Sequence, residues 1–319
     1  MQMVTGKFIA GCVGLLMVGI AHAGSQSDWA RFLDQATFGA RPEDVDAWKQ
    51  QSMDGWIKAQ AALPATQYPD LPPYPQNSNN GCPGTGAVRN DCLRQNYSMY
   101  PLQVQFFQNA LSAPDQLRQK VAFALSEILV VSGVKVRQPS SVSPYLNVLV
   151  NGALGNFRDL LEQVTLNPAM GYYLDMVNSD PASANGVLKP NENYAREVLQ
   201  LFSMGLYELK PDGTLVLDQK GQPIPSYSQD DIEGFAAAFT GWTYATQAGA
   251  KSQKHNPVNY QSPMEPYSVN GQDANHDPSA KALLAYKGAV SQNLPANQTA
   301  VKDLSDALDN IFYHPNVGP

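Results

Sequence analysis

The amino-acid sequence predicts a mainly α-helical fold, a multi-helix globular domain with one small β-hairpin and long polar loops. Apolar residues recur at helical spacing through most of the chain, and Ser or Asn precedes many of these stretches while Gly follows them. Only residues 214–227 show a weak strand alternation, on both sides of a turn at 218–221. We therefore expect residues 24–319 to form a single mainly helical domain.

The first part of this domain combines two short helices with a long loop. Ser27 suits the N-cap of the first helix, whose apolar stripe consists of Trp29, Phe32, Leu33 and Ala36. Pro42 suits the first turn of the second helix. Residues 63–96 are rich in Pro, Asn and Gly without helical periodicity, which predicts a long loop.

The most apolar helix is expected to follow this loop. Ser112 and Asp115 resemble a capping box, with Asp in place of the usual Glu. Residues 121–131 are apolar on nearly all sides, so this stretch is expected to be central and buried. Glu127 lies within it, and a buried carboxylate needs a partner because leaving it unpaired is costly.

Further helices are expected in the second half of the chain. Their predicted starts are Asn156, Asn167-Pro168, Asn191-Glu192 and the capping box Ser228 to Asp231. Residues 245–275 are polar and lack periodicity, which predicts a long exposed loop or insertion within the domain.

The N-terminus has the three parts of a secretory signal peptide in residues 1–23. Lys7 precedes an apolar stretch, and Ala21-His22-Ala23 provides small residues at the cleavage positions. Cleavage near Ala23-Gly24 predicts a secreted or periplasmic protein. A lipoprotein box around Cys12 is an alternative, but most of the apolar stretch follows that cysteine rather than preceding it.

Two cysteines remain after this cleavage, Cys82 and Cys92, on either side of a Gly-rich segment. In an oxidising compartment such a pair predicts a disulfide, which would contribute roughly 2–3 kcal/mol by restricting the unfolded chain. A metal site is the alternative, although no His lies nearby.

The composition excludes several classes of function. The formal net charge is −7 and no long basic run occurs, so nucleic acid is not an expected partner. The mature sequence has no apolar stretch of transmembrane length. It also has no G-x-S-x-G nucleophile turn and no phosphate-binding glycine loop.

Five stretches of the sequence are similar to one bacterial family, the domain of unknown function 1800. They are Arg31–Gly39, Arg118–Ser132, Asn191–Gly205, Tyr227–Trp242 and His314–Pro319, and the most specific is Asn-Glu-Asn-Tyr-Ala-Arg-Glu within the third. The resemblance implies an exported protein, often encoded beside a second exported family related to sulfatases, which is the expected partner. It implies no reaction. Family members continue beyond the last stretch, so the resemblance also implies that this chain is truncated at its C-terminus.

The helix expected after Asn191 provides the first candidate for chemistry. Glu192, Arg196 and Gln200 share one face and Glu197 lies beside them, an arrangement that can orient a polar substrate or adjust a general acid. A structural role is the alternative, in which Arg196 is largely buried and pairs with a carboxylate. Glu127 is the first expected partner and Asp175 the second.

A second candidate site consists of His276, Asp277 and His314, whose side chains suit a divalent metal, although their spacing matches no known ligand motif. No other cofactor is expected. His255 is expected to be a solvated surface residue.

Two functions from different classes remain open. One is a partner or assembly protein acting with another exported protein. The other is an exported enzyme acting on an extracellular polymer, with Glu192, Arg196 and Glu197, together with a metal ion, as its candidate catalytic groups.

Overall fold

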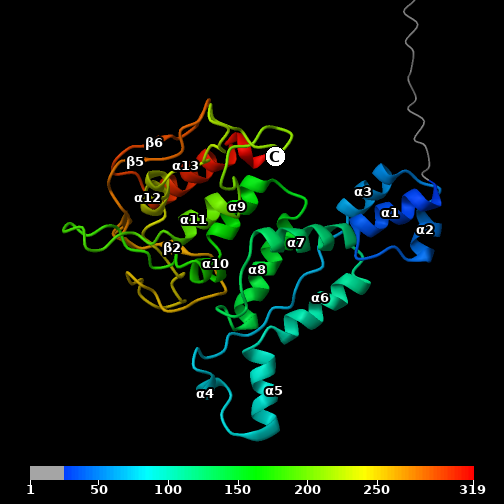
Figure 1. Cartoon of the computed structure of the whole chain (residues 1–319). Helices are drawn as coiled ribbons and strands as arrows, with labels where there is room; N and C mark the ends of the chain where they lie inside the picture. The colour runs from blue at the N-terminus through cyan, green and yellow to red at the C-terminus, as the bar shows by residue number, and fades with distance from the viewer. Residues whose placement is uncertain (1–24) are drawn as a thin grey trace, which may run out of the picture.

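The computed structural model describes residues 25–319, and its fold is mainly α-helical, as predicted (Figure 1). The expected signal peptide, residues 1–23, lies outside the described residues. The helices are α1 (Gln26–Ala36), α2 (Pro42–Trp48), α3 (Met53–Ala61), α4 (Ser78–Gly81), α5 (Gly86–Asn96), α6 (Tyr100–Ser112), α7 (Gln116–Ile128), α8 (Pro139–Gly152), α9 (Phe157–Thr165), α10 (Pro168–Tyr173), α11 (Asn193–Gln200), α12 (Gln229–Ala238), α13 (Ala300–Phe312) and the 3-10 helix η1 (Pro315–Val317).

Short strands form three two-stranded antiparallel sheets. They pair β1 (Trp242–Thr243) with β2 (Glu265–Pro266), β3 (Ser268–Val269) with β4 (Gln272–Asp273), and β5 (Lys281–Ala282) with β6 (Asn293–Leu294). No helix among residues 25–319 is both long and apolar enough to cross a membrane.

The three N-terminal helices form a lobe with a small apolar cluster of its own, to the right in Figure 1. Its buried side chains are Trp29, Leu33, Val45 and Trp56. Phe32 packs edge-to-face against Trp29 and Trp56, with ring centroids 5.5 Å and 5.2 Å apart. Such contacts add to the free energy of burying the rings.

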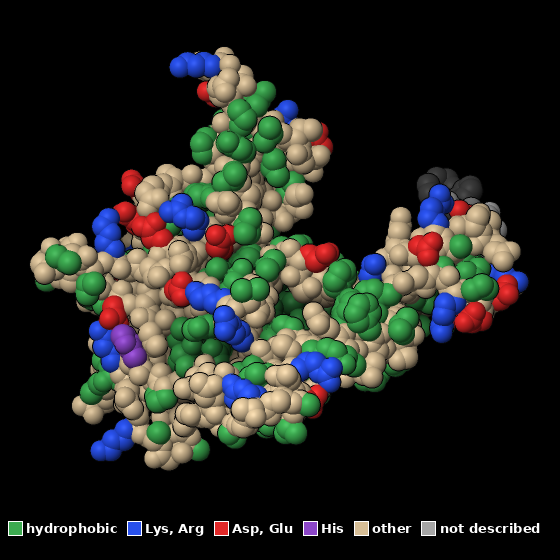
Figure 2. Space-filling model, turned by 60° about the horizontal axis from the view of Figure 1, so that its bottom comes forward, with side chains coloured by type: hydrophobic (Ala, Val, Ile, Leu, Met, Phe, Trp, Pro, Cys, Tyr) green, Lys and Arg blue, Asp and Glu red, His purple; other side chains and the backbone are tan. Residues whose placement is uncertain are grey.

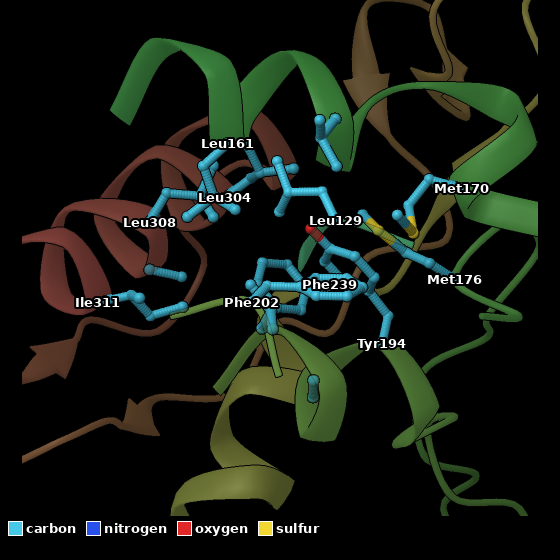
Figure 3. Packing of buried hydrophobic residues seen from close by; sticks show 14 of the residues in the cluster. Leu129, Leu161, Met170, Met176, Tyr194, Phe202, Phe239, Leu304, Leu308 and Ile311 are labelled. Atoms are coloured by element: carbon cyan, nitrogen blue, oxygen red, sulfur yellow. The ribbon is translucent and has the colours of Figure 1, made fainter. Parts of the chain in front are cut away.

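The main apolar core lies between α7–α13, and Figure 3 shows its centre. Leu161 of α9 packs near Leu304 and Leu308 of α13, and Tyr194 and Phe239 approach from α11 and the end of α12. The Tyr194 hydroxyl, fully enclosed, lies 2.5 Å from Oγ1 of Thr165. Burial raises the pKa of Tyr194 above its usual value, so the phenol stays neutral in the core.

Side-chain caps fix where several helices begin. Ser228 and Asp231 complete the predicted capping box of α12, and Asn156 and Asn167 cap α9 and α10 as expected. At α1 the cap is Ser25 rather than the predicted residue two positions later, because Ser25 completes a capping box with N3.

Residues 63–96 are not the continuous loop that the sequence predicted, because α4 and α5 form within them. Asn77 caps α4 by accepting a hydrogen bond from the backbone N–H of Asn79. The predicted disulfide is present and joins Cys82, after α4, to Cys92 on α5, with their Cα atoms 5.7 Å apart. This region therefore contains two short helices, α4 and α5, which are joined by a disulfide bond.

The expectation of a wholly buried helix at 121–131 was wrong. α7 packs against α3, α6 and α8 but leaves one side open, and Glu127 lies exposed on that side. Its start also differs from the predicted capping box, because Ser112 ends α6 instead. The Asp115 carboxylate is fully buried and accepts hydrogen bonds from the N–H and hydroxyl of Thr66.

The predicted hairpin is present and includes a third segment. Isolated β-bridges join residues 207–209, 215–217 and 223–225. Glu208 N–H donates to the Ile224 carbonyl, Val216 N–H to the Glu208 carbonyl, and Ile224 N–H to the Val216 carbonyl. Each segment thus bonds to both of the others.

Residues 245–275 are not the long exposed loop that the sequence predicted, because they contain the short strands β2, β3 and β4 and several buried side chains. Asn256, Tyr260 and Met264 are buried, and the Asn256 side chain donates to the Tyr244 carbonyl. His255 contacts Asp180 through Nε2 at 2.9 Å. A polar side chain of this segment therefore hydrogen-bonds to a backbone group near the core, and the segment is packed against the domain.

Candidate functional site

The first candidate, on α11, is an open polar cluster near the start of α12. Arg196 Nη2 lies 2.9 Å from Glu192 Oε2, and their side chains retain 41% and 27% of their exposure. The Gln229 side chain completes the cluster by donating to Glu192 (3.0 Å) and accepting from Arg196 (3.2 Å). The cluster leaves part of the guanidinium facing solvent, where it can hold an anionic or polar group.

The predicted burial of Arg196 was wrong, and so were both of its predicted partners, although it does contact a carboxylate. Glu127 is exposed on α7, and Asp175 is bound by Lys135 and Asn193 instead. Glu192 lies one helical turn before Arg196, so the ion pair itself is local to α11.

Glu197 occupies a different environment on the same helix. Its Oε2 is buried and has no hydrogen-bond partner among residues 25–319. Nearby, the Tyr227 hydroxyl donates to Gln200 Oε1 at 3.0 Å, and burial raises the pKa of Tyr227. The Glu197 charge adds to that increase, while the Arg196 charge opposes it.

A small hollow of about 200 Å³ adjoins the α11 cluster. Its charged lining residues are Lys189, Glu192, Glu233 and Asp277, of which Lys189 and Glu233 form an ion pair at 3.3 Å. The hollow thus brings Glu192 of the first candidate to the same place as Asp277 of the second.

The three residues of the metal candidate have separate partners. His276 contacts Asp303, Asp277 accepts hydrogen bonds from Ser279, and His314 accepts one from the backbone N–H of Asn316. Within the described residues, no three His, Cys, Asp or Glu side chains are placed to hold one metal ion.

A buried charged cluster contains His276 and was not expected from the sequence. Asp303 Oδ2 lies 2.8 Å from both His276 Nε2 and Lys281 Nζ, and the three side chains are at most 3% exposed. Lys281 also donates to two backbone carbonyls of its own loop, and His276 Nδ1 faces the Thr240 carbonyl. Asp303 and Lys281 are far apart in sequence and resemble ordinary surface charges, so no local pattern identified them.

An apolar groove with a volume of about 400 Å³ lies between α6, α7 and α8. Its lining includes Phe38, Leu102, Phe106, Phe107, Phe123 and Leu149. Figure 2 shows hydrophobic side chains gathered at the surface where the N-terminal lobe meets the main body.

α6 carries an apolar stripe that faces solvent beside this groove. Tyr100, Val104, Phe107 and Leu111 retain 40%, 38%, 62% and 76% of their exposure. Their steps of four, three and four residues match the seam by which one helix packs on another. Neither α6 nor the outward direction of its stripe was predicted from the sequence.

Comparison with known proteins gives one match. No curated protein and no solved structure matches the chain. A family model described as "Protein of unknown function (DUF1800)" matches residues 31–319. The chain therefore belongs to the DUF1800 family of proteins of unknown function.

Proposed function

We propose that this protein is an exported partner protein that binds an amphipathic helix of another exported protein along α6. The observation that carries the proposal is the outward apolar stripe of α6 beside the 400 Å³ groove. Helix-in-groove recognition uses anchors with this spacing. Exposed contiguous apolar surface of this kind commonly marks a protein contact.

Charge favours a different protein over a second copy of this chain as the occupant. α6 has no charged residue, and Lys120 of α7 lies at the groove with its Nζ 5.1 Å from the Phe38 ring centroid. Lys120 forms no ion pair among residues 25–319. A partner helix flanked by Asp or Glu would neutralise it, whereas α6 of a second copy carries no carboxylate that could do so.

A photo-crosslinking residue tests this proposal in the full-length chain expressed in its host. We expect a crosslinker at Leu111 to capture one exported protein, the neighbouring sulfatase-related protein being the first expectation. A crosslinker at Val88 of α5, which is 81% exposed, serves as the control and should capture none. Phe107→Glu should abolish the Leu111 crosslink without lowering Tm. A crosslink between two copies of the chain, or equal capture from both positions, would reject the proposal.

Export itself rests on residues 1–23, with their charged start, apolar middle and Ala-His-Ala end. N-terminal sequencing of the mature protein should give Gly24 or a neighbouring residue as the first. A mature chain that retains Met1 or begins at a lipidated Cys12 would contradict export by this route.

An exported enzyme acting on an extracellular polymer is the second candidate function, and the hollow beside α11 is the observation that favours it. Arg196 would hold an anionic substituent, and Glu192 or Asp277 would transfer protons. Glu192→Gln should then abolish turnover of the polymer while Glu162→Gln, on the surface of α9, leaves it intact. Measuring the metal content of the purified protein tests the metal-dependent version.

A further inference from the structure

A second and larger cavity, of about 650 Å³, lies at the base of the α4–α5 projection seen at the bottom of Figure 1. One wall is made by Ser78 of α4 and by Leu93 and Tyr97 at α5. The opposite wall is the segment 134–138 and the first turn of α8. The disulfide joins α4 to α5 and therefore holds the first wall together.

The cavity has a positive end although the whole protein is acidic, with a formal net charge of −7. Its lining contains Lys135 and Arg137 and no Asp or Glu. Lys135 is paired with Asp175 at 2.6 Å, which lies outside the lining. Arg137 forms no ion pair among the described residues, and its one hydrogen bond goes from Nε to the Val134 carbonyl at 3.4 Å. Its terminal guanidinium nitrogens are thus available to an anion.

The N-terminus of α8 adds to this positive end. Gln138 is the N-cap of this 14-residue helix, and its side chain makes no capping hydrogen bond. The partial positive charge of such a terminus stabilises anions. Ser141, in the first turn, is fully buried in the cavity lining, and its Oγ has no hydrogen-bond partner among residues 25–319. A buried hydroxyl without a partner is uncommon, and a ligand oxygen at this end would supply one.

Aromatic and amide side chains form the rest of the lining. Tyr172 and Tyr260 pack edge-to-face with centroids 6.2 Å apart, and Lys135 Nζ lies 5.6 Å from the Tyr172 centroid. Gln76 and Ser78 add polar groups on the α4 side. A fatty acid would leave these groups unpaired, whereas a sugar ring can pack its C–H face on tyrosine and pair its hydroxyls with amides.

We propose that this cavity binds an acidic sugar unit of an extracellular polysaccharide. Its carboxylate or sulfate contacts Arg137 and the N-terminus of α8, and its ring packs against Tyr172. This site is separate from the α6 surface, so the proposal goes beyond the partner function and can fail independently of it.

Titration calorimetry on the whole protein tests the proposal with four probes: a short oligogalacturonate, a sulfated neutral oligosaccharide, its unsulfated parent and inorganic sulfate. We expect the oligogalacturonate, the sulfated oligosaccharide or both to bind. Which of the two binds shows whether the site takes a carboxylate or a sulfate. The unsulfated parent and free sulfate should each bind at least about tenfold more weakly. Binding of the unsulfated parent or of free sulfate as tight as that of the acidic oligosaccharide would overturn the proposal, as would binding of none of the four probes.

Variants separate the cavity from a general charge effect. Arg137→Gln and Tyr172→Ala should each weaken binding of the acidic oligosaccharide about tenfold. Arg31→Gln removes a surface cation that pairs with Asp28 outside the cavity, so it should bind like the parent protein. Phe107→Glu on α6 should also leave sugar binding unchanged. Unchanged binding by Arg137→Gln, or an equal loss in Arg31→Gln, would overturn the assignment.

Discussion

Two clusters in this protein are built from the same kinds of charged groups but in opposite environments. At α11, Arg196 and the N-cap residue Glu192 form an open pair with 41% and 27% of their side-chain exposure. Between the 276–281 loop and α13, Lys281 and Asp303 form a pair that is at most 1% exposed. Both pairs have short N–O distances, 2.9 Å and 2.8 Å.

The difference lies in what each cluster leaves available. The buried cluster is closed, since none of its three side chains lines any of the described cavities, and its contacts join a loop to α13. The open cluster borders a hollow and keeps part of a guanidinium in water. A short ion pair therefore indicates structure in one case and an available surface in the other, and exposure distinguishes the two.

The largest expected effect is from Lys281→Met in the buried cluster. Removing this cation leaves the fully buried Asp303 charge with only His276 beside it, and breaking such a pair typically costs about 3–5 kcal/mol. Urea denaturation should show this loss of unfolding free energy. Lys302→Met is the matched control, because that lysine is 60% exposed beside Asp306 on α13 and should change stability by less than about 1 kcal/mol. Equal effects of the two substitutions would remove the distinction between the clusters.

Arg196→Gln should have a much smaller effect on stability. The pair is solvent-screened and local to one helix, so the expected loss of unfolding free energy is below about 1 kcal/mol. Arg158→Gln provides the comparison, because Arg158 is 13% exposed and joins α9 to Asp309 of α13 at 2.7 Å. Arg158→Gln should lower the unfolding free energy more than Arg196→Gln does in the same denaturation experiment. The reverse order would mean that side-chain exposure does not determine how much each ion pair stabilises the fold.

The sequence predicted what depends on neighbouring residues. Helix starts at Asn156, Asn167 and Ser228 were found because a cap and its N–H partner lie within three residues. The disulfide was found because only two cysteines follow the expected cleavage site.

What the sequence could not predict depends on which helices meet. Asp303 and His276 are 27 residues apart, and their contact requires the 276–281 loop to reach α13. Glu127 was expected to be buried because its surroundings are apolar in sequence. In the fold the neighbours of α7 cover only part of its circumference and leave that residue in solvent. The helix α6 was not predicted at all, and the direction of its apolar stripe depends in the same way on which helices meet.

His314 is a buried ionisable group without a carboxylate partner, unlike either cluster. Its side chain is mostly enclosed, its ring packs against Tyr286 at 4.8 Å, and Nδ1 accepts the Asn316 N–H at 3.1 Å. Burial without a carboxylate partner lowers the pKa of His314 below its usual 6.5. The ring of His314 is therefore held neutral.

His314→Asn should flatten the pH dependence of stability below neutrality. Between the lowered folded pKa and 6.5, the unfolded chain binds more protons at His314 than the folded chain does, so stability is complete above 6.5 and falls as pH decreases. Asn keeps an acceptor for the Asn316 N–H but does not titrate, so this part of the decline disappears. Urea midpoints from pH 7.5 to about pH 5 measure it, with His255→Asn as the exposed control because that ring pairs with Asp180. If the parent protein and His314→Asn decline in parallel, the ring is not held neutral by burial, and enclosure alone does not determine the charge of a group in this fold.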